Sequence, residues 1–292
     1  MKNFPLLLLL FAFASQASAQ TTLQVVTKTI EKTARWKPGY ALEINGEKAE
    51  VEVSPGTSDA QITVRAELTA KHPSLDTAQL DVETWKFVLS TVGKKIYVRA
   101  YIGLKNGQPV PTSNLKAKII VQAPATCPVS LANKLGRVRL ENLRGPIALT
   151  GEFCHFQLAN LGGDVWLDSR YGSVEGKGLS GKIALKTTRA DVTLSDLRSD
   201  CSVQSQYGTI TLEARPSTGN LAVQGEKSEV RLRLPDDAGH NVHLRSAYGD
   251  IAAPSQFTSF APAENVRQAN LQSGDGRPFV SIETTFGKIT VE

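Results

Sequence analysis

Three side chains in the second half of the chain are the best candidates for binding or chemistry. Trp166 and Asp168 lie two residues apart, and Lys186 follows Asp168 after 18 residues. A polysaccharide lyase or hydrolase needs carboxylates, or a carboxylate with Arg or Lys, converging on one groove. Asp164, Asp168 and Lys186 come nearest to such a group, but a solvated ladder of mixed charges explains them better. We assign no catalytic residue and name Trp166, Asp168 and Lys186 as candidate binding residues on an outer face.

Trp166 is the most suggestive of these residues, because equivalent segments of the chain carry Ser or Ala at its position. An exposed indole is a platform on which a sugar ring can stack. The alternative is that Trp166 lies beneath a loop or beneath the N-terminal region. The sequence leaves both interpretations open.

The four histidines give no sign of a metal site. His240 and His243 form the run His-Asn-Val-His, but residues i and i+3 of a strand point to opposite faces, which argues against shared metal binding. The sequence contains no phosphate-binding loop, nucleophile elbow or zinc-protease motif. We therefore predict no metal, no cofactor and no catalytic activity, with a polysaccharide-active enzyme as the alternative.

An 18-residue repeat must position the candidate residues. Blocks begin at residues 128, 146, 164, 182 and 200, and apolar residues recur at their second, fourth, eleventh and thirteenth positions. The fourth position, for example, holds Leu131, Leu149, Leu167, Leu185 and Val203. Apolar and polar residues alternate at two places in each block, which predicts two short strands, with glycines at the block ends supplying turns. Looser blocks restart near residues 220, 241 and 279.

Repeats of this length cannot bury an apolar face alone and must stack on one another. The predicted fold is all-β, a right-handed parallel β-solenoid (β-helix) of about eight turns with Leu185 pointing inward. A left-handed solenoid needs apolar residues every six positions, but the tenth position of the blocks is polar, and parallel crossovers are strongly right-handed. An insertion at about residues 254–278, rich in Ser, Ala, Gln and Gly, is predicted to be a surface loop.

A second regularity places an aromatic residue before a glycine at the same corner of every second block. The pairs are Tyr171-Gly172, Tyr207-Gly208, Tyr248-Gly249 and Phe286-Gly287. In one interpretation the rings form a stacking platform for sugars or bases. We favour a structural corner in which the glycine turns the chain and the ring covers its neighbours, because the ring always precedes the same glycine.

Residues 20–126 are also β-rich but lack the regular repeat. Alternating apolar residues predict strands near residues 42–44, 51–53, 62–64, 82–89, 96–98 and 119–121. Ser74 is expected to cap a short helix at residues 74–80. Because an open solenoid end is a sheet edge that pairs readily with another chain, we assign this region the role of a cap and interpret it as a decorated start of the same stack. The boundary near Pro124–Pro128 leaves residues 127–292 as the repeat domain.

Composition and the N-terminus indicate the compartment. The 292 residues carry 33 basic and 28 acidic side chains with no long run of one sign, which argues against a nucleic-acid binder. Lys2, an apolar segment at residues 4–14 and the run Ala17-Ser18-Ala19 predict a signal peptide at residues 1–19. No later segment is apolar for long enough to span a membrane. We expect an exported protein that is periplasmic, at the cell surface or secreted.

The three cysteines are an odd number for an oxidising compartment. Cys127 and Cys154 form a disulfide in one interpretation, which leaves Cys201 unpaired. In the interpretation that we favour, all three are small buried residues.

Several runs between residue 119 and the C-terminus carry a resemblance to a known family. They are Ile119-Ile120-Val121-Gln122-Ala123-Pro124, Gly145-Pro146-Ile147-Ala148-Leu149, the repeated Gly-x-Ile/Val-x-Leu/Val turns, and the closing Thr284-Thr285-Phe286-Gly287-Lys288-Ile289. Over roughly residues 40–292 the chain resembles the exported adhesin-like domains of bacteria, a family of unknown function related to the heads of autotransporter adhesins. The resemblance implies a right-handed β-helix-like solenoid at the bacterial envelope and offers no catalytic residue. The expected function is a non-catalytic structural or binding module whose partner is a protein or glycan of the envelope.

Overall fold

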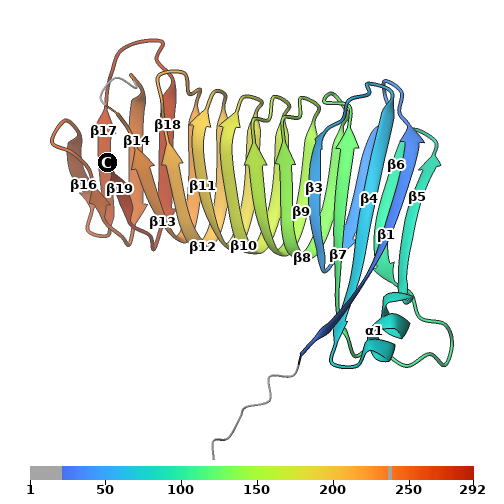
Figure 1. Ribbon diagram of the computed structural model, residues 1–292. Coiled ribbons are helices and arrows are strands. Elements are labelled where there is room, and N and C mark those ends of the chain that lie inside the picture. Colours follow the sequence, from blue (N-terminus) through green and yellow to red (C-terminus); the bar gives the residue numbers. More distant parts are fainter. Residues whose placement is uncertain (1–21, 236–238) are drawn as a thin grey trace, which may run out of the picture.

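The structure is an elongated stack of β-strands (Figure 1). This computed structural model describes residues 22–235 and 239–292, so the predicted signal peptide at residues 1–19 lies outside the described residues. In these ranges nineteen strands form one continuous, open sheet, and the prediction of a β fold is confirmed by a structure that is nearly all β. Within these ranges the only helix is α1 (Leu75–Val82), and none has the length and hydrophobicity of a membrane span.

The middle of the stack is built from six long strands that pair in parallel. They are β8 (Val129–Glu141), β9 (Ile147–Ala159), β10 (Val165–Leu179), β11 (Ile183–Leu197), β12 (Cys201–Glu213) and β13 (Leu221–Arg233). Leu149 pairs with Leu167, and Leu167 with Leu185, so neighbouring strands from β8 to β12 are offset by the 18 residues of the repeat, whereas Cys201 of β12 pairs with Leu221 of β13. Each block of the sequence is therefore one layer of the stack, which we call a rung.

Each long strand bends near its middle, so that one strand contributes to both faces of the stack. At the bend of β10, Tyr171 has a left-handed conformation with φ 56°. Alternate residues on both sides of the bend are buried, such as Leu167 and Val174. The two short strands predicted per block are thus the two halves of one bent strand. Their inward side chains form a core along the stack, to which each buried Leu, Ile or Val contributes about 1.5–3 kcal/mol.

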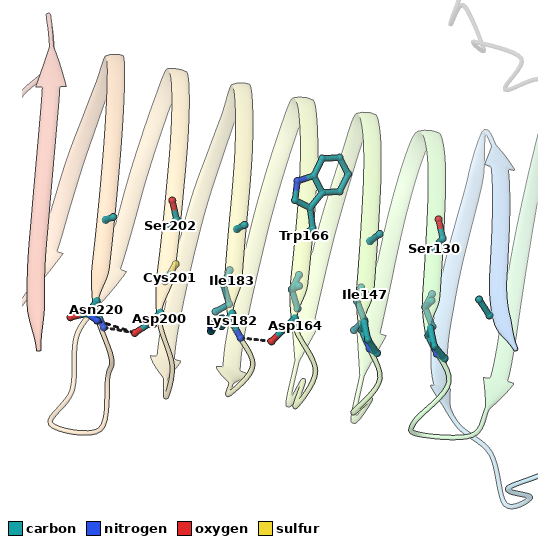
Figure 2. Close-up of a pocket in the computed structure, with 18 residues that line it drawn as sticks. Ser130, Ile147, Asp164, Trp166, Lys182, Ile183, Asp200, Cys201, Ser202 and Asn220 are labelled. Carbon is teal, nitrogen blue, oxygen red and sulfur yellow. Dashed lines mark hydrogen bonds between the residues drawn. The ribbon is translucent and has the colours of Figure 1, made fainter. Parts of the chain in front are cut away.

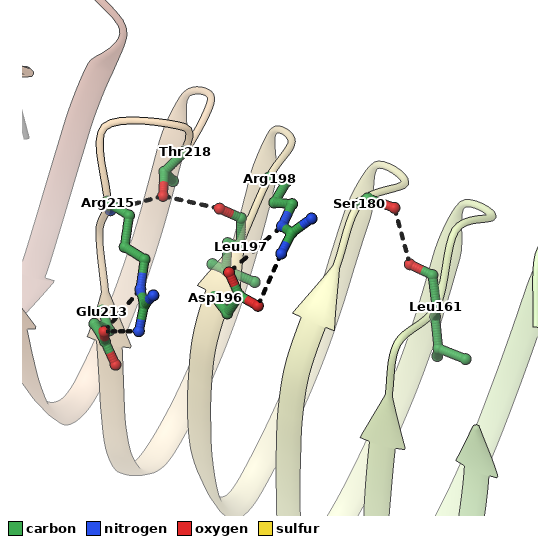
Figure 3. A network of polar contacts seen from close by, with 8 residues as sticks. All are labelled: Leu161, Ser180, Asp196, Leu197, Arg198, Glu213, Arg215 and Thr218. Atoms are coloured by element: carbon green, nitrogen blue, oxygen red, sulfur yellow. Dashed lines mark hydrogen bonds and ion pairs between the residues drawn. The ribbon is translucent and has the colours of Figure 1, made fainter. Parts of the chain in front are cut away.

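Hydrogen bonds also join the connections between rungs (Figure 3). Ser180 Oγ donates to the carbonyl of Leu161 at 3.4 Å, and Thr218 Oγ1 donates to the carbonyl of Leu197 at 2.9 Å. Two partly exposed ion pairs, Arg198–Asp196 and Arg215–Glu213, join the ends of β11 and β12 to the connections that follow them. Exposed pairs contribute about 1 kcal/mol at most, so the core and the strand ladder hold the rungs together.

Residues 22–123 first continue the stack and then change its pairing. β2 (Ala41–Glu47) and β3 (Ala49–Pro55) both pair in parallel with β8 and so form a further rung. β6 (Lys95–Ile102) and β7 (Asn114–Ala123) add to them in parallel. The outermost strands are antiparallel: β5 (Trp85–Val92) pairs with β6, and β4 (Gln61–His72) joins β7 to β1 (Gln24–Arg35). Ser74 caps α1 as predicted, and its hydroxyl accepts a hydrogen bond from the Thr77 amide.

The C-terminal end departs from chain order. β18 (Phe279–Thr285) lies between β13 and β14 (Asn241–Ala247), and β19 (Ile289–Val291) lies between β13 and β15 (Ile251–Ala252). The prediction of a surface loop at residues 254–278 is wrong for much of the insertion. β16 (Thr258–Ala263) and β17 (Val266–Leu271) form an antiparallel hairpin, and β17 pairs with β14. Polar composition suggested a loop, but the backbone groups at the open edge of β14 need partners, and the hairpin supplies them.

All three cysteines are buried free thiols. Burial raises the pKa of Cys127 to about 11 and that of Cys201 to about 12, and it also raises the pKa of Cys154. The interpretation without a disulfide therefore agrees with the structure.

Candidate functional site

Trp166 projects from an outer face near the middle of the stack (Figure 2). It lies on β10, and 48% of its surface is exposed. The strand register places Ala148 and Ala184 beside it on the neighbouring rungs. Because both alanines are short, the indole rises above its neighbours. The structure thus places Trp166 on the surface and not beneath the N-terminal region.

A shallow groove with a volume of about 760 Å³ runs across the rungs at Trp166. The small side chains aligned along it are Ser130, Ala148, Ala184, Ser202 and Ala222. Five rung spacings of about 4.8 Å make this row roughly 24 Å long. The row is apolar apart from two hydroxyl groups, and Trp166 divides it.

Polar side chains form one rim of the groove. Asp164 Oδ1 accepts a hydrogen bond from the Lys182 amide at 2.9 Å, and Asp200 Oδ1 accepts one from the Asn220 amide at the same distance (Figure 2). Each carboxylate is therefore tied to the start of the next rung. Asp164, which the sequence analysis grouped with Asp168 and Lys186, thus holds two adjacent rungs together by a hydrogen bond.

Asp168 and Lys186 lie on the same face as Trp166. Asp168 is two residues beyond Trp166 on β10, and Lys186 is its register partner on β11. Neither forms an ion pair within 4.0 Å in the part of the chain that the structure describes. Asp168 lines a hollow of about 360 Å³ with Arg170, and Lys186 lines another of about 510 Å³ with Gln204. The structure therefore brings the three candidate residues onto one surface, with an aromatic groove beside polar hollows.

The aromatic residues of the corner motif, and not its glycines, make the sharp turn. Tyr171, Tyr207, Tyr248 and Phe286 have φ between 56° and 58°. The glycine that follows each of them permits close approach between rungs. A Cβ atom at Gly172, Gly208, Gly249 or Gly287 would lie 1.9–2.3 Å from a carbonyl oxygen of the adjacent rung.

Three of the four rings of the corner motif are substantially exposed. Tyr207, Phe286 and Tyr248 are 42%, 54% and 61% exposed, because the corner is convex and projects their side chains outward. Tyr171 nevertheless stacks on Phe153, and Tyr248 stacks on Phe286, so rings of the motif do lie against their neighbours along the stack.

The histidines hold separate partners. His240 is buried against the carbonyl of Thr218, and His243 Nδ1 lies 2.8 Å from Asn270 Oδ1. No group of three or more His, Cys, Asp and Glu side chains suited to a metal occurs among residues 22–235 and 239–292.

One polar cluster on the opposite face was missed from the sequence. His155 Nδ1 is hydrogen-bonded to Ser173 Oγ, and His155 Nε2 lies 3.6 Å from Glu175 Oε1 and 3.3 Å from Gln157 Nε2. The cluster joins two adjacent rungs. The sequence could have indicated this contact, because His155 and Ser173 are 18 residues apart and therefore occupy the same position in adjacent rungs.

Comparisons with known proteins identify the family of the chain. Residues 40–292 match the family model described as Toastrack DUF4097. No curated protein matches the sequence.

Similar solved structures include three bacterial proteins. A "putative adhesin" from Parabacteroides merdae has 9% identity and a TM-score of 0.40 over 91% of this chain and 96% of that chain. A "putative lipid binding protein" from Parabacteroides distasonis has 13% identity and a TM-score of 0.39 over 90% and 96%. A "putative adhesin" from Bacteroides fragilis has 12% identity and a TM-score of 0.35 over 91% and 97%. Such low identities and TM-scores say nothing about what this chain binds. The family model, in contrast, spans every rung of the stack, and the chain belongs to the Toastrack DUF4097 family, whose function is unknown.

Proposed function

We propose that this protein is an exported, non-catalytic, adhesin-like binding module of the bacterial envelope, and that it binds an extended glycan along the groove at Trp166. The observation that carries this proposal is a half-exposed indole standing in a row of Ala and Ser residues. An aromatic side chain in that position leaves apolar surface in water, which ordinary packing does not require.

The surface around Trp166 supplies what a glycan needs. The indole offers an apolar surface for a sugar ring, and the row of small residues leaves room for further rings on both sides. Asp168 and Lys186 offer a hydrogen-bond acceptor and donors for hydroxyl groups. Since neither is engaged in an ion pair within the described ranges, both remain available to a ligand.

A glycan array combined with a pull-down from envelope extract tests this proposal. We expect Trp166→Ala to weaken glycan binding at least tenfold, whereas Trp166→Phe retains most of it. Phe260→Ala is the matched control, because Phe260 is 45% exposed on β16, far from the groove. Unchanged binding by Trp166→Ala contradicts the placement. Capture of a protein that still binds after removal of glycans contradicts the ligand class.

The enzyme alternative has its own test. The protein is incubated with a panel of uronate polymers, and new reducing or unsaturated ends are measured. We expect none. Ends that appear with the native protein and are lost in Asp168→Asn would show a polysaccharide-active enzyme on this scaffold.

The compartment and the hand of the stack belong to the same proposal. Mass spectrometry of the exported protein is expected to find Gln20 as its first residue, and an intact N-terminus contradicts cleavage there. The strands are proposed to wind as a right-handed solenoid of about eight turns, because crossovers between parallel strands have that hand in nearly all proteins. A crystal structure with the opposite hand contradicts this.

A further inference from the structure

Two corners of the rungs share a backbone conformation but differ in side chains. At one corner φ lies between 50° and 68°, and the residues are Asn142, Asn160, Gly178 and Asp196. At the other corner φ lies between 49° and 63°, and the residues, in their order along the stack, are Lys48, Leu135, Phe153, Tyr171, Arg189, Tyr207, Lys227, Phe286 and Tyr248. We call these nine residues the corner ridge.

The left-handed backbone explains which residue types occupy the first corner but not which occupy the second. A left-handed conformation is unfavourable for residues with a Cβ atom, and Gly, Asn and Asp tolerate it best. The corner at Asn142 follows this rule, whereas none of the nine residues of the corner ridge is Gly, Asn or Asp. A requirement other than the turn itself must therefore determine the side chains of the corner ridge.

Contacts along the corner ridge form a ladder with the spacing of the rungs. The rings of Phe153 and Tyr171 stack with centroids 4.7 Å apart, and those of Tyr248 and Phe286 stack at 5.0 Å. The Arg189 guanidinium lies between two rings, 5.8 Å from Tyr171 and 5.5 Å from Tyr207. Stacked rings cover one another's faces and present their edges, so the corner ridge is poorly suited to stack on sugars or bases.

The exposed side chains of the corner ridge have the composition of a membrane interface. Leu135, Phe153, Tyr207, Phe286 and Tyr248 are between 41% and 61% exposed. The other members are the half-buried Tyr171 and three exposed cations, and the ridge holds no carboxylate. Aromatic rings lie at the headgroup level of bilayers, and Lys and Arg are attracted to anionic headgroups.

Carboxylates flank the corner ridge at some rungs, and the exposed Glu47 directly precedes Lys48. Glu152, which precedes Phe153, is paired with Lys134 at 3.3 Å. Glu226, which precedes Lys227, accepts a hydrogen bond from Gln206 at 2.8 Å.

We propose that the corner ridge docks this protein on the surface of an anionic lipid bilayer. The ridge is a convex line on a rigid stack, and a flat surface can touch such a line at every rung. The aromatic and leucine side chains enter the headgroup region, while Lys48, Arg189 and Lys227 contact lipid phosphates. This role uses a different part of the rung from the groove at Trp166 and does not depend on glycan binding.

Vesicle co-sedimentation tests the docking surface. The exported protein, with its first residue established by mass spectrometry so that no apolar leader remains, is mixed with vesicles of phosphatidylcholine alone or with phosphatidylglycerol. We expect binding to rise with phosphatidylglycerol and to fall with salt. The combined substitutions Phe153→Asn, Phe286→Asn and Tyr248→Asn should weaken binding at least tenfold without loss of folding, since Asn tolerates the left-handed conformation.

The matched control removes the same number of exposed apolar side chains elsewhere. The combined substitutions Leu80→Asn, Val92→Asn and Val110→Asn, at positions that are 65–76% exposed, should leave vesicle binding unchanged, as should Trp166→Ala. Equal loss of binding in this control, or no binding by the native protein, overturns the proposal. A dimer that dissociates only in the ridge variant would instead assign the corner ridge to a second copy and also overturn it.

Discussion

The middle of the stack and its N-terminal end bury the same kind of core but treat their edges differently. In the middle, each of the strands from β8 to β13 has a parallel neighbour on both sides. At the N-terminal end the pairing becomes antiparallel, with β5 on β6 and with β4 between β7 and β1. A parallel repeat can be extended without limit, whereas antiparallel strands with a helix beside them break the pattern. This difference shows that the parallel repeat determines where Trp166 lies, whereas the antiparallel N-terminal strands are the last strands at their end of the stack.

The largest expected effect is that of a charge in the middle of the core. Leu185→Asp should lower the free energy of unfolding by about 5 kcal/mol, because it removes leucine packing and buries a carboxyl group. Ala184→Asp, one residue away on the outer face, is the control and should cost less than about 1 kcal/mol. Thermal and urea unfolding measure both changes. An unchanged melting temperature for Leu185→Asp contradicts the register of the stack.

Two tryptophans sharpen the comparison between the regions. Trp85, in the N-terminal region, is 3% exposed, and Trp85→Ala should cost about 3–5 kcal/mol. Trp166→Ala should cost less, about 1–2 kcal/mol, since about half of its side chain is already exposed to solvent. Urea titrations of the two variants measure how far each substitution lowers the free energy of unfolding. Similar destabilisation by both would show that Trp166 is a structural residue.

Substitutions at two glycines compare a position where rungs pack closely with a position in an open turn. A Cβ atom at Gly163 would lie 2.0 Å from the carbonyl oxygen of Gly145, so Gly163→Ala should cost about 2–3 kcal/mol. Gly93, in the turn between β5 and β6, has φ 59° and open space around it, so Gly93→Ala should cost about 1 kcal/mol. Calorimetry of the two variants shows which substitution lowers the stability of the protein more. A larger loss at Gly93 would mean that the rungs are not in the close contact described above.

The smallest effect at neutral pH concerns the thiols. Because burial raises the folded pKa of Cys127 and Cys201 above the ordinary 9.0, the stability from their neutral forms is complete below about pH 9 and falls as pH rises toward 11–12. At pH 8 we expect the native protein to resist a thiol reagent that labels all three cysteines in urea, with Cys201 in the stack slower than Cys127 at its start. Rapid native labelling of Cys201 would be inconsistent with this burial.

Much of the middle of the stack could be predicted from the sequence. An apolar residue such as Leu167 recurs every 18 positions, and a strand that buries one face has few alternative registers. The order of β13, β18 and β14 could not be predicted, because an apolar pattern indicates that a strand stacks but not which neighbour it chooses. The corner at Tyr171-Gly172 was predicted, but the turn was assigned to the glycine, since the left-handed backbone conformation usually selects glycine and not tyrosine.

The candidate site was only partly visible in the sequence. Trp166 was identifiable because it interrupts a column of Ala and Ser, and the shared face of Asp168 and Lys186 follows from strand alternation. The groove depends on the whole row of small side chains across the rungs, which has no motif of its own. The ladder of rings and cations could not be recognised either, because Arg189 and Lys227 do not resemble the aromatic residues between which they lie.

Quenching of tryptophan fluorescence tests the central claim most directly. Of the three tryptophans, Trp36 and Trp85 are 7% and 3% exposed, so acrylamide should quench mainly Trp166. We predict that an envelope glycan that binds the protein protects the fluorescence of Trp166 from acrylamide. The Trp166→Phe variant should lack the component of the fluorescence that acrylamide quenches. A bound glycan that leaves Trp166 fully open to acrylamide would contradict the assignment of the groove as the binding site.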